Sequence, residues 1–391
     1  MANRIGMEVS FAVAEAAKLA RSEVVAAYPI TPQTHIVEKL AELVAEGELD
    51  AEYIPVESEH SAMSACLGSS AVGARTFTAT AGQGLELMHE VLFVASSSRL
   101  PIVMAVANRA ISGPLNVWGD HSDVMAARDC GWIQIFTENG QEAFDLTLCA
   151  FRIAEDHRVL FPIMVHLDGF HLSHMVESLY LLEQSEVDAF LPPYKYPFAL
   201  DPGKPVTLGA YGPPFIYTEA RKAQEVALRS SKEVILEVWR EFNRRFGRQY
   251  SPVEKYATEG ADTLLLTMGS FSETASIAID NLRKQGEKVG QIRLRLWRPF
   301  PFEELCQAVS KAKTVIILDR AICTGGPGGP VCSEVKSALY HLKDRPQVIS
   351  FVGGLGGRDI SVADFENIIR RGQKLAAQGV GEHYEMIGLR E

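Results

Sequence analysis

Short apolar segments rich in β-branched residues recur along the first half of the chain, and longer segments with apolar residues at helical spacing separate them. The apolar segments predict strands at residues 24–28, 53–56, 76–79, 102–107 and 161–166. The segments between them predict helices at residues 6–20, 34–45, 61–71, 85–95 and 142–155. Strands that alternate with helices are typical of a parallel sheet covered on both faces. The pattern therefore predicts a first α/β unit that ends near residue 185.

The middle of the chain has a different pattern. Proline is dense in residues 190–205, which excludes a regular helix or an inner strand and predicts an ordered linker. Residues 216–248 are charged and carry apolar residues at helical spacing, so we expect one long helix. A second α/β unit begins at about residue 261. Its predicted strands are 263–268, 290–297, 314–319 and 347–352, and its predicted helices are 273–285, 302–312, 329–341 and 362–376.

We therefore expect an α/β protein in three parts: a domain over residues 1–189, the linker and long helix over 190–260, and a second domain over 261–391. Glycine-rich loops follow strand ends in the second domain, where ligands and partners of open α/β sheets gather. These loops are MGSFSET, CTGGPGGP and GGLGGRD. None matches a dinucleotide fingerprint or a phosphate-binding loop, so the sequence assigns no nucleotide to this domain.

Composition narrows the class of protein. Hydrophobic residues make up 47% and charged residues 22%, the balance of a soluble globular protein. No segment reaches the roughly 18 unbroken apolar residues of a membrane helix. Glu8, Glu15 and Lys18 interrupt the apolar N-terminal segment that a signal peptide would need. The net charge of -11, without a long basic run, argues against nucleic acid. We expect a cytoplasmic protein that binds neither nucleic acid nor membranes.

The six cysteines show no spacing typical of a metal site. No pair has the CxxC spacing that iron–sulfur and zinc sites favour. We therefore expect buried thiols and no metal bound by this chain. If the protein transfers electrons through clusters, those clusters lie on another chain.

The segment YPITPQT (residues 28–34) follows the first predicted strand and precedes a helix. Pro29 and Pro32 stiffen this turn and leave the hydroxyl and backbone of Thr31 available. One interpretation is a helix N-cap with proline near the first helical position. The other is a substrate contact, because α/β enzymes place such contacts at strand-to-helix turns.

The segment IPVESEHSAMSACLG (residues 54–68) places Glu57 and Glu59 at the end of the second predicted strand. Ser58, Glu59 and Ser61 are typical of a helix start, with acidic residues at its positive end. A carboxylate held against the small residues of this helix could instead share or donate a proton in a reaction.

Two further features follow strands. Glycine in the turn AGQG (residues 81–84) permits either close approach of Gly82 and Gly84 to a ligand or a simple chain reversal. A buried strand then ends at Arg109, whose planar donor fork fits a carboxylate. That carboxylate belongs either to a bound ligand or to an acidic neighbour such as Asp120 or Asp123.

Together these segments resemble a known family. YPITPQT, PVESEHSAMSA, ANRAISGP and WGDHSD are similar to segments of the alpha subunit of pyruvate:ferredoxin oxidoreductase and related 2-oxoacid:acceptor oxidoreductases. GEKVGQIRLRLWRPFP, ILDR with its following Gly-Pro loop, and GGLGGRDI extend the resemblance over nearly the whole chain, in the same order. The resemblance implies a first domain like the pyrimidine-binding domain of thiamine-diphosphate enzymes. It implies a second domain like the C-terminal domain of transketolase.

The resemblance also implies catalytic roles for three residues. Glu59 matches the glutamate that contacts the pyrimidine nitrogen of thiamine diphosphate and so promotes formation of its reactive ylid. Thr31 and Arg109 match the residues that hold the oxo and carboxylate groups of the 2-oxoacid. His60 and His121 lie beside matched positions and receive no role.

Further contacts with the cofactor are expected from Pro29, Gly82 and Gly84, together with Glu59. One departure affects the two glycines, because the turn TATAGQGL is slightly longer here than the TASQGL form of fused relatives.

A missing motif implies a partner. Thiamine-diphosphate enzymes bind the diphosphate and magnesium with a GDG motif and a later asparagine, whereas here Gly119 and Asp120 are followed by His121. The resemblance therefore implies a beta subunit that carries this motif. It also implies gamma and ferredoxin-like delta subunits, or another electron-transfer subunit, that hold the iron–sulfur sites. Coenzyme A is the implied co-substrate.

The implied activity is CoA-dependent oxidative decarboxylation of a 2-oxoacid, most directly of pyruvate to acetyl-CoA and CO2, with ferredoxin as acceptor. Phenylglyoxylate and branched-chain 2-oxoacids are alternatives that depend on pocket residues such as Pro114, Val117 and Trp118. A non-catalytic scaffold subunit belongs to a different class, and intact Glu59 and Arg109 argue against it. The missing dinucleotide fingerprint argues against an independent NAD-dependent enzyme.

Overall fold

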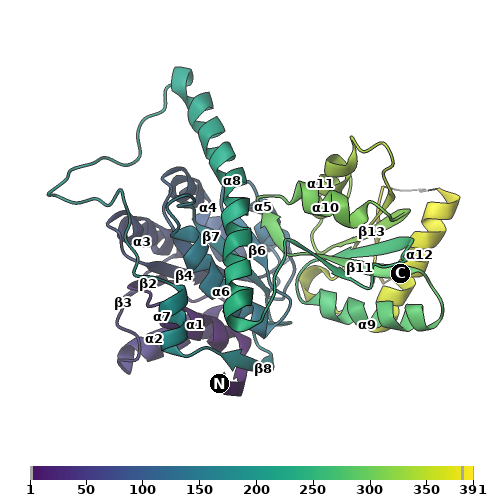
Figure 1. The fold of residues 1–391 in the computed structure, drawn as a ribbon, viewed down its shortest axis with the longest axis horizontal. Helices are drawn as coiled ribbons and strands as arrows, with labels where there is room; N and C mark the ends of the chain where they lie inside the picture. The colour runs from purple at the N-terminus through teal and green to yellow at the C-terminus, as the bar shows by residue number, and fades with distance from the viewer. Residues whose placement is uncertain (1–2, 380–382, 391) are drawn as a thin grey trace.

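The structure of the protein, a computed structural model, describes residues 3–379 and 383–390. Two sheets, each covered by helices, form two units that lie next to one another (Figure 1). The first unit, purple to teal in Figure 1, also carries the long helix α8 (Pro214–Phe246), which packs on α6 (Gly140–Ala154). The second unit is green to yellow. This arrangement confirms the predicted α/β class.

The first sheet contains seven strands in the order β12-β6-β7-β5-β4-β2-β3. The strands are parallel except β12, which pairs antiparallel with β6. Because helices cover both faces, the inner strands β4, β5 and β7 are buried along their whole length. The strands are β2 (Val24–Ala27), β3 (Glu52–Pro55), β4 (Thr76–Thr80), β5 (Ile102–Asn108), β6 (Ile133–Phe136), β7 (Ile163–Asp168) and β12 (Leu296–Arg298). The helices are α1 (Val9–Leu19), α2 (Thr34–Ala45) and α6 on one face, and α3 (Glu59–Ala71) and α4 (Gly82–Ser97) on the other.

The second sheet contains six strands in the order β15-β14-β13-β10-β11-β9, and its strands are parallel except β9. Two hydrophobic cores lie on its two faces, one under α10 and α11 and the other under α9 and α12. The strands are β9 (Val253–Tyr256), β10 (Thr263–Thr267), β11 (Val289–Leu294), β13 (Thr314–Asp319), β14 (Gln347–Val352) and β15 (Glu385–Met386). The helices are α9 (Phe271–Lys284), α10 (Phe302–Val309), α11 (Pro330–Leu339) and α12 (Val362–Gln378).

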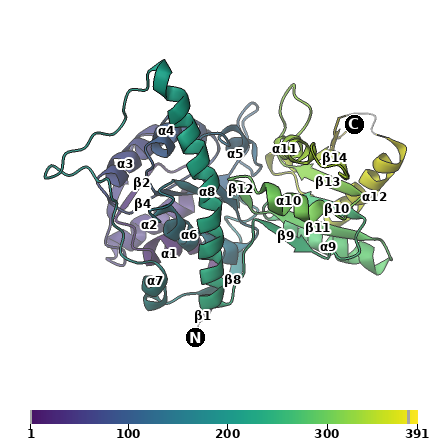
Figure 2. The same ribbon diagram turned by 45° about the horizontal axis from the view of Figure 1, so that its top comes forward.

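The two units share a strand and a core. β12 follows β11 in sequence but pairs with β6 at the edge of the first sheet, at the junction of the two units (Figure 2). Val124, Met125 and Phe136 of the first unit pack into the core of the second. Buried contacts therefore fix the relative position of the units.

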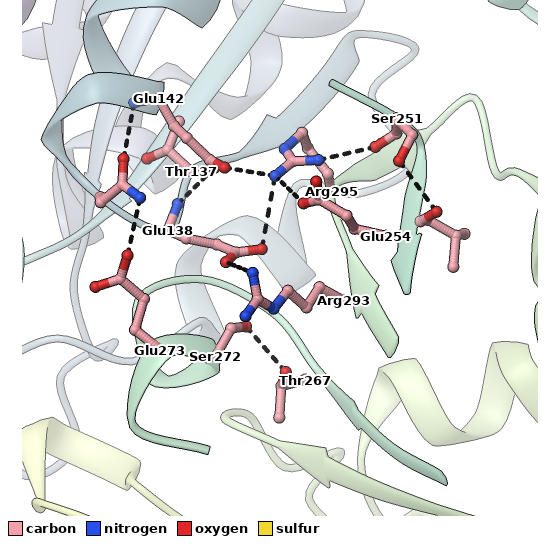
Figure 3. Close-up of polar contacts among 12 residues, drawn as sticks. Thr137, Glu138, Glu142, Ser251, Glu254, Thr267, Ser272, Glu273, Arg293 and Arg295 are labelled. Carbon is pink, nitrogen blue, oxygen red and sulfur yellow. Dashed lines mark hydrogen bonds and ion pairs between the residues drawn. The ribbon is translucent and has the colours of Figure 1, made fainter. Parts of the chain in front are cut away.

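A largely buried cluster of charged residues lies at the same junction (Figure 3). Nη2 of Arg295 lies 2.5 Å from a carboxylate oxygen of both Glu142 and Glu254. Glu138 lies 3.0 Å from Arg293 and 3.7 Å from Arg295. Since three carboxylates face two guanidinium groups, one proton neutralises the cluster. Burial, together with the charge of Glu142, raises the pKa of Glu138 to about 8, so Glu138 holds that proton at neutral pH.

The proline-rich segment is irregular, as the sequence predicts. Residues 191–213 connect α7 (Gln184–Phe190) to α8 without a regular helix or a strand of either sheet. α8 begins at Pro214, earlier than predicted, because proline at the first helical position lacks only an N–H that the helix leaves unbonded. It ends before Gly247, whose φ of 73° terminates the helix.

Two predictions are wrong because they overlooked a strand boundary. The helix predicted at 6–20 begins at Val9, because residues 3–8 form β1 (Asn3–Glu8), paired antiparallel with β8 (Val176–Leu181). The strand predicted at 290–297 is split, because the chain leaves the second sheet at Arg295 and enters the first sheet as β12. In both cases pairing with a distant segment decides the structure.

The other sequence expectations concern cysteines and membranes. The six cysteines are free thiols. Two of them, Cys306 and Cys323, are only partly buried, and the other four are buried as predicted. In the part of the chain that the structure describes, no helix combines the length and apolarity needed to cross a bilayer.

Candidate active site

Two glycines let the start of α4 approach two charged side chains. At Gly82, where φ is 46°, a Cβ atom would lie 2.9 Å from Cδ of Arg109. At Gly84, a Cβ atom would lie 2.7 Å from Oε1 of Glu59 and 2.5 Å from Oγ1 of Thr80. Neither position accepts a larger residue without displacement of its neighbours. The fold therefore brings four of the predicted site residues, Glu59, Gly82, Gly84 and Arg109, to one turn.

Glu59 is the first residue of α3 and is only 6% exposed. The helix cap is Ser58, whose hydroxyl oxygen accepts a hydrogen bond from the backbone N–H of Ser61. Among the described residues, none donates a hydrogen bond to the Glu59 carboxylate. The carboxylate is therefore available to a group outside the described chain.

Arg109 lies directly after β5 and is 7% exposed. Its Nη1 donates to the carbonyl oxygen of Thr31 over 3.0 Å, and its Nε donates to the carbonyl oxygen of Asn116 over 2.9 Å. No carboxylate of the described ranges lies within 4.0 Å of the guanidinium. Burial lowers the pKa of Arg109, and the charges of Asp123 and Glu59 oppose this effect. The guanidinium remains charged and lacks an ion-pair partner.

Asp123 is the acidic neighbour that the sequence offered as a partner for Arg109, but its role is different. Its carboxylate accepts hydrogen bonds from the backbone N–H groups of Gly82 and Arg109, over 3.0 and 2.9 Å. It also accepts one from Nδ2 of Asn108, over 3.0 Å. Burial raises the pKa of Asp123 to about 7. Asp123 thus ties the turn at Gly82 to the end of β5, and sequence reasoning did not assign it this function.

The turn that carries Thr31 contributes backbone to the site. Nε2 of Gln33 donates to the carbonyl oxygens of Tyr28 and Ala79, over 2.8 and 3.3 Å, and so fixes the turn against β4. The carbonyl oxygen of Thr31 binds Arg109, while its side chain is exposed. Pro29 is also exposed. Contacts of Thr31 and Pro29 with ligands stay predictions.

Several buried polar atoms lack partners near this turn. They are Oγ1 of Thr80, Nε2 and Oε1 of Gln83, and Oε1 of Glu86, none of which has a hydrogen-bond partner among the described residues. Burial raises the pKa of Glu86. Because buried polar groups in folded proteins are usually hydrogen-bonded, these atoms indicate a surface that a ligand or a partner completes.

The second unit holds the loop that follows Arg109. Nδ2 of Asn116 donates to the carbonyl oxygen of Gly356 over 3.1 Å, and the N–H of Gly356 donates to Asp120 over 2.9 Å. The N–H of Gly357 donates to the carbonyl oxygen of Gly119 over 2.9 Å. The GGLGGRD loop of the second domain therefore positions the backbone carbonyl that binds Nε of Arg109. The sequence predicted that this loop lies where ligands and partners bind, but it predicted none of these contacts.

Asp168 joins the carboxyl ends of the two sheets. It accepts a hydrogen bond from the backbone N–H of Ser270 over 2.7 Å, lies 2.8 Å from Nε2 of His121 and pairs with Arg320. Burial alone would raise the pKa of Asp168, but the charges of Arg320 and His121 hold it well below its usual range. His121, which received no role from the sequence, thus belongs to a buried interdomain network.

The remaining candidates lie outside this centre. His60 is exposed on one side and lies 3.9 Å from Glu90. Asp120, in the sequence position that most resembles a metal-binding GD pair, uses its carboxylate to accept hydrogen bonds from Ser122 and Gly356. The side chain of Asp120 is therefore engaged in structure.

Two known protein families match the sequence of this chain. Residues 15–240 match the family described as "Pyruvate flavodoxin/ferredoxin oxidoreductase, thiamine diP-bdg". Residues 261–365 match "Pyruvate:ferredoxin oxidoreductase core domain II". The chain belongs to the pyruvate:ferredoxin oxidoreductase family. Glu59, Gly82, Gly84 and Arg109 all lie in the part matched by the thiamine-diphosphate-binding family.

Relatives in this family are similar over nearly their whole length. The chain is 47% identical over 386 residues to pyruvate synthase subunit PorA of Pyrococcus furiosus, covering 98% of this chain and 97% of that one. It is 52% identical over 366 residues to PorA of Methanocaldococcus jannaschii, covering 93% of both. It is 47% identical over 372 residues to ketoisovalerate oxidoreductase subunit VorA of Pyrococcus abyssi, covering 95% of this chain and 93% of that one.

Two solved structures share the fold of this family member. A 2-oxoglutarate:ferredoxin oxidoreductase from Magnetococcus marinus, with 2-oxoglutarate, coenzyme A and succinyl-CoA bound, has a TM-score of 0.72 at 21% identity, and the match covers 95% of this chain and 65% of that chain. A split-gene transketolase, an inactive beta4 tetramer, has a TM-score of 0.55 at 12% identity, covering 95% and 100%. At these identities the likeness concerns the fold alone. It confirms the expected combination of a thiamine-diphosphate-enzyme fold with a transketolase-like second domain.

Proposed function

We propose that this chain is the alpha subunit of a 2-oxoacid:ferredoxin oxidoreductase that converts pyruvate and coenzyme A to acetyl-CoA and CO2. The main support for the proposal is that two buried charged groups, the Glu59 carboxylate and the Arg109 guanidinium, lie beside the same turn at residues 82–84. Neither charge has an ion-pair partner in the described chain. A cofactor and an anionic substrate would supply the missing partners.

The residues around Glu59 fit thiamine diphosphate. A buried carboxylate without a donor, a glycine at position 84 that leaves room beside it, and the unpartnered hydroxyl of Thr80 form a polar cradle. When bound, thiamine diphosphate supplies a nucleophilic carbon and an electron sink for decarboxylation. Glu59 would hold a proton at the pyrimidine nitrogen, while Gly82, Gly84 and Pro29 would line the ring.

Arg109 fits the carboxylate of a 2-oxoacid. A guanidinium has five N–H donors, and the described contacts use one at Nε and one at Nη1. The donors that remain on Nη1 and Nη2 form an edge that can bind a carboxylate bidentately. The exposed hydroxyl of Thr31, on the residue whose carbonyl binds Arg109, would then donate to the 2-oxo group.

The reaction needs partner subunits in this proposal. A beta subunit would hold the diphosphate and magnesium, because Asp120 is engaged in structural contacts and the GDG motif is missing. Gamma and ferredoxin-like delta subunits, or another electron-transfer subunit, would carry the iron–sulfur sites. The unpartnered polar atoms of Gln83 and Glu86 are consistent with a surface that a partner completes.

A branched-chain 2-oxoacid is the second candidate substrate, because the ketoisovalerate relative is as similar, at 47% identity, as the Pyrococcus furiosus pyruvate synthase subunit. Pro114, Val117 and Trp118 follow Arg109 and would set the size of the pocket. Trp118 is 51% exposed in the isolated chain.

The test is an assay of the purified complex for CoA-dependent ferredoxin reduction with pyruvate, 3-methyl-2-oxobutanoate and phenylglyoxylate. We expect the highest kcat/KM with pyruvate. A clear preference for either other acid would reassign the substrate, and no activity with any 2-oxoacid would contradict the proposal. The isolated chain, given thiamine diphosphate and Mg2+, should be inactive, and full activity would refute the need for partners.

A further inference from the structure

Three side chains with metal-binding atoms meet outside the proposed active site. Glu8 ends β1 directly before α1, His35 lies in the first turn of α2, and His174 lies in the loop between β7 and β8. Ligand atoms from the three lie within 4.8 Å of one another. The ring centroids of the two histidines are 4.4 Å apart. Since the three segments are distant in sequence, the fold itself assembles this group.

Each of the three side chains is available for coordination. The Glu8 carboxylate does not cap α1 and lies 2.6 Å from Nδ1 of His35. Nδ1 of His174 lies 2.8 Å from the hydroxyl of Ser173, an arrangement in which a protein oxygen orients the ring and leaves Nε2 for a ligand.

A simple hydrogen-bonded pair explains only part of this arrangement. It accounts for Glu8 and His35, but it leaves the His174 ring tilted against a second imidazole, without a hydrogen bond to that carboxylate in the described residues. One bound cation would interact favourably with the carboxylate and with both imidazole nitrogens.

We propose that Glu8, His35 and His174 form a binding site for one divalent transition-metal ion, with Zn2+ as the best fit. Two imidazole nitrogens and a carboxylate oxygen suit zinc and its neighbours, whereas Mg2+ and Ca2+ prefer oxygen ligands. Zinc bonds of about 2.0–2.2 Å in a tetrahedron separate ligand atoms by roughly 3.3–3.5 Å. The contact between Glu8 and His35 therefore opens slightly on binding, which their partly exposed side chains permit. The expectation of a chain without metal rested on cysteine spacing and did not weigh these histidines.

The ion would brace the turn that carries Thr31. α2, which holds His35, begins directly after this turn. On the other side, Gly169 packs so closely on Pro32 that a Cβ atom at Gly169 would lie 2.6 Å from Cγ of the proline. Gly169 precedes His174 in the same loop. An ion that joins α1, α2 and this loop thus holds the turn from two sides, and stabilises the fold without a part in the chemistry.

The test uses the full chain without a polyhistidine tag, freed of metal with a chelator and titrated with Co2+ and Zn2+. Wild type should bind one Co2+ with the spectrum of nitrogen and oxygen ligands, and Zn2+ should raise Tm where Mg2+ does not. In the variant with both His35→Gln and His174→Gln, the affinity should fall at least about tenfold and the Tm shift should disappear. Glu8→Gln, which keeps a hydrogen-bonding amide beside His35, should also weaken binding.

The matched control is His89→Gln. His89 lies 3.8 Å from Glu86, one turn away on α4, and has the same histidine–glutamate chemistry without a second histidine. The His89→Gln variant should bind Co2+ as wild type does. The proposal is wrong if wild type binds no Co2+, if the spectrum shows thiolate-to-cobalt charge transfer, or if the two-histidine and Glu8 variants bind unchanged. These readouts do not use catalytic activity, so they decide independently of the proposed function.

Discussion

Nη1 of Arg109 donates a hydrogen bond to the carbonyl oxygen of Thr31 over 3.0 Å. This bond joins the end of β5 to the turn after β2, two strands that are not neighbours in the sheet. The guanidinium is thereby oriented by the protein alone. In the proposed reaction, the carboxylate of the substrate meets an arginine that is already in place, which reduces the entropy lost on binding.

Arg109→Lys should lower kcat/KM for pyruvate more than it lowers stability. Lysine keeps the charge but loses the bidentate edge. A hydrogen bond to a charged group contributes roughly 1.5–3 kcal/mol, so kcat/KM should fall about 10–150-fold. Steady-state kinetics and thermal melting of the same complex measure both quantities.

The matched control for this substitution is Arg99→Lys. Arg99 also binds main-chain carbonyl oxygens, those of Leu160 and Val159, but far from the turn at Gly82. Arg99→Lys should lower Tm and leave kcat/KM unchanged. If Arg109→Lys shows this same pattern, its role is structural and the substrate carboxylate binds elsewhere.

Asn116→Ala should raise KM for pyruvate with a smaller effect on kcat. The substitution keeps the carbonyl that binds Arg109 but removes two side-chain hydrogen bonds, one to the carbonyl oxygen of Gly356 and one from the backbone N–H of Trp118. The loop after β5 thus loses part of its anchor on the second domain, and the loss of the interdomain bond alone, about 0.5–1.5 kcal/mol, corresponds to roughly a 2–13-fold change. Asn281→Ala removes a comparable bond between α9 and α12 and should leave KM unchanged. Equal KM values for both variants would show that the interdomain contact does not position Arg109.

Glu138 should make stability depend on pH. Its pKa rises from 4.5 to about 8 in the folded protein, mainly through burial. The folded state therefore holds this proton more tightly than the unfolded chain, and the stabilisation is complete below about pH 4.5 and is lost as the pH rises through 8. Glutamine cannot ionise. The Tm of Glu138→Gln should match wild type near pH 4.5 and exceed it by a growing margin up to about pH 8.

A matched variant tests whether the pH dependence of stability comes from Glu138 or from the loss of any glutamate charge. Glu219 lies on the exposed end of α8, and Glu219→Gln should follow wild type across the pH range. A margin for Glu138→Gln that stays constant with pH would mean that the cluster at the junction holds no proton.

Local patterns predicted most of the fold. The buried strands β4, β5 and β7 follow from short-range periodicity, because each is buried on both faces. β6 is equally buried but was not predicted. β1 and β12 could not be predicted in this way. β1 is a strand only because β8 pairs with it, and β12 leaves one sheet for another at Arg295. The division of the chain at residues 189 and 260 stays a prediction, and β12 shows that the second part completes the first sheet.

The candidate site was only partly predictable. The identities of Glu59, Thr31 and Arg109 came from a family resemblance, whereas residue chemistry alone left capping and ion-pairing interpretations open. The partners of Arg109 are backbone carbonyls, which have no signature in the sequence. Asp123 and Asn116 act on backbone groups in the same way, and their positions depend on loops from both domains. The segment WGDHSD contributed to the family resemblance, but it did not predict these contacts.

The most direct test of the account is kcat of the assembled complex with Glu59→Gln, measured beside Glu57→Gln. Glutamine keeps the shape of Glu59 but cannot hold a proton at the pyrimidine nitrogen of the cofactor, and positioned acid–base catalysis is typically worth about 10²–10⁴ in rate. Glu57 is exposed in the same segment and bonds Ser61, so its variant controls for effects on the start of α3. We predict a loss of about 10²–10⁴ in kcat for Glu59→Gln, with normal assembly, and normal kcat for Glu57→Gln. Near-normal turnover with Glu59→Gln would contradict the account.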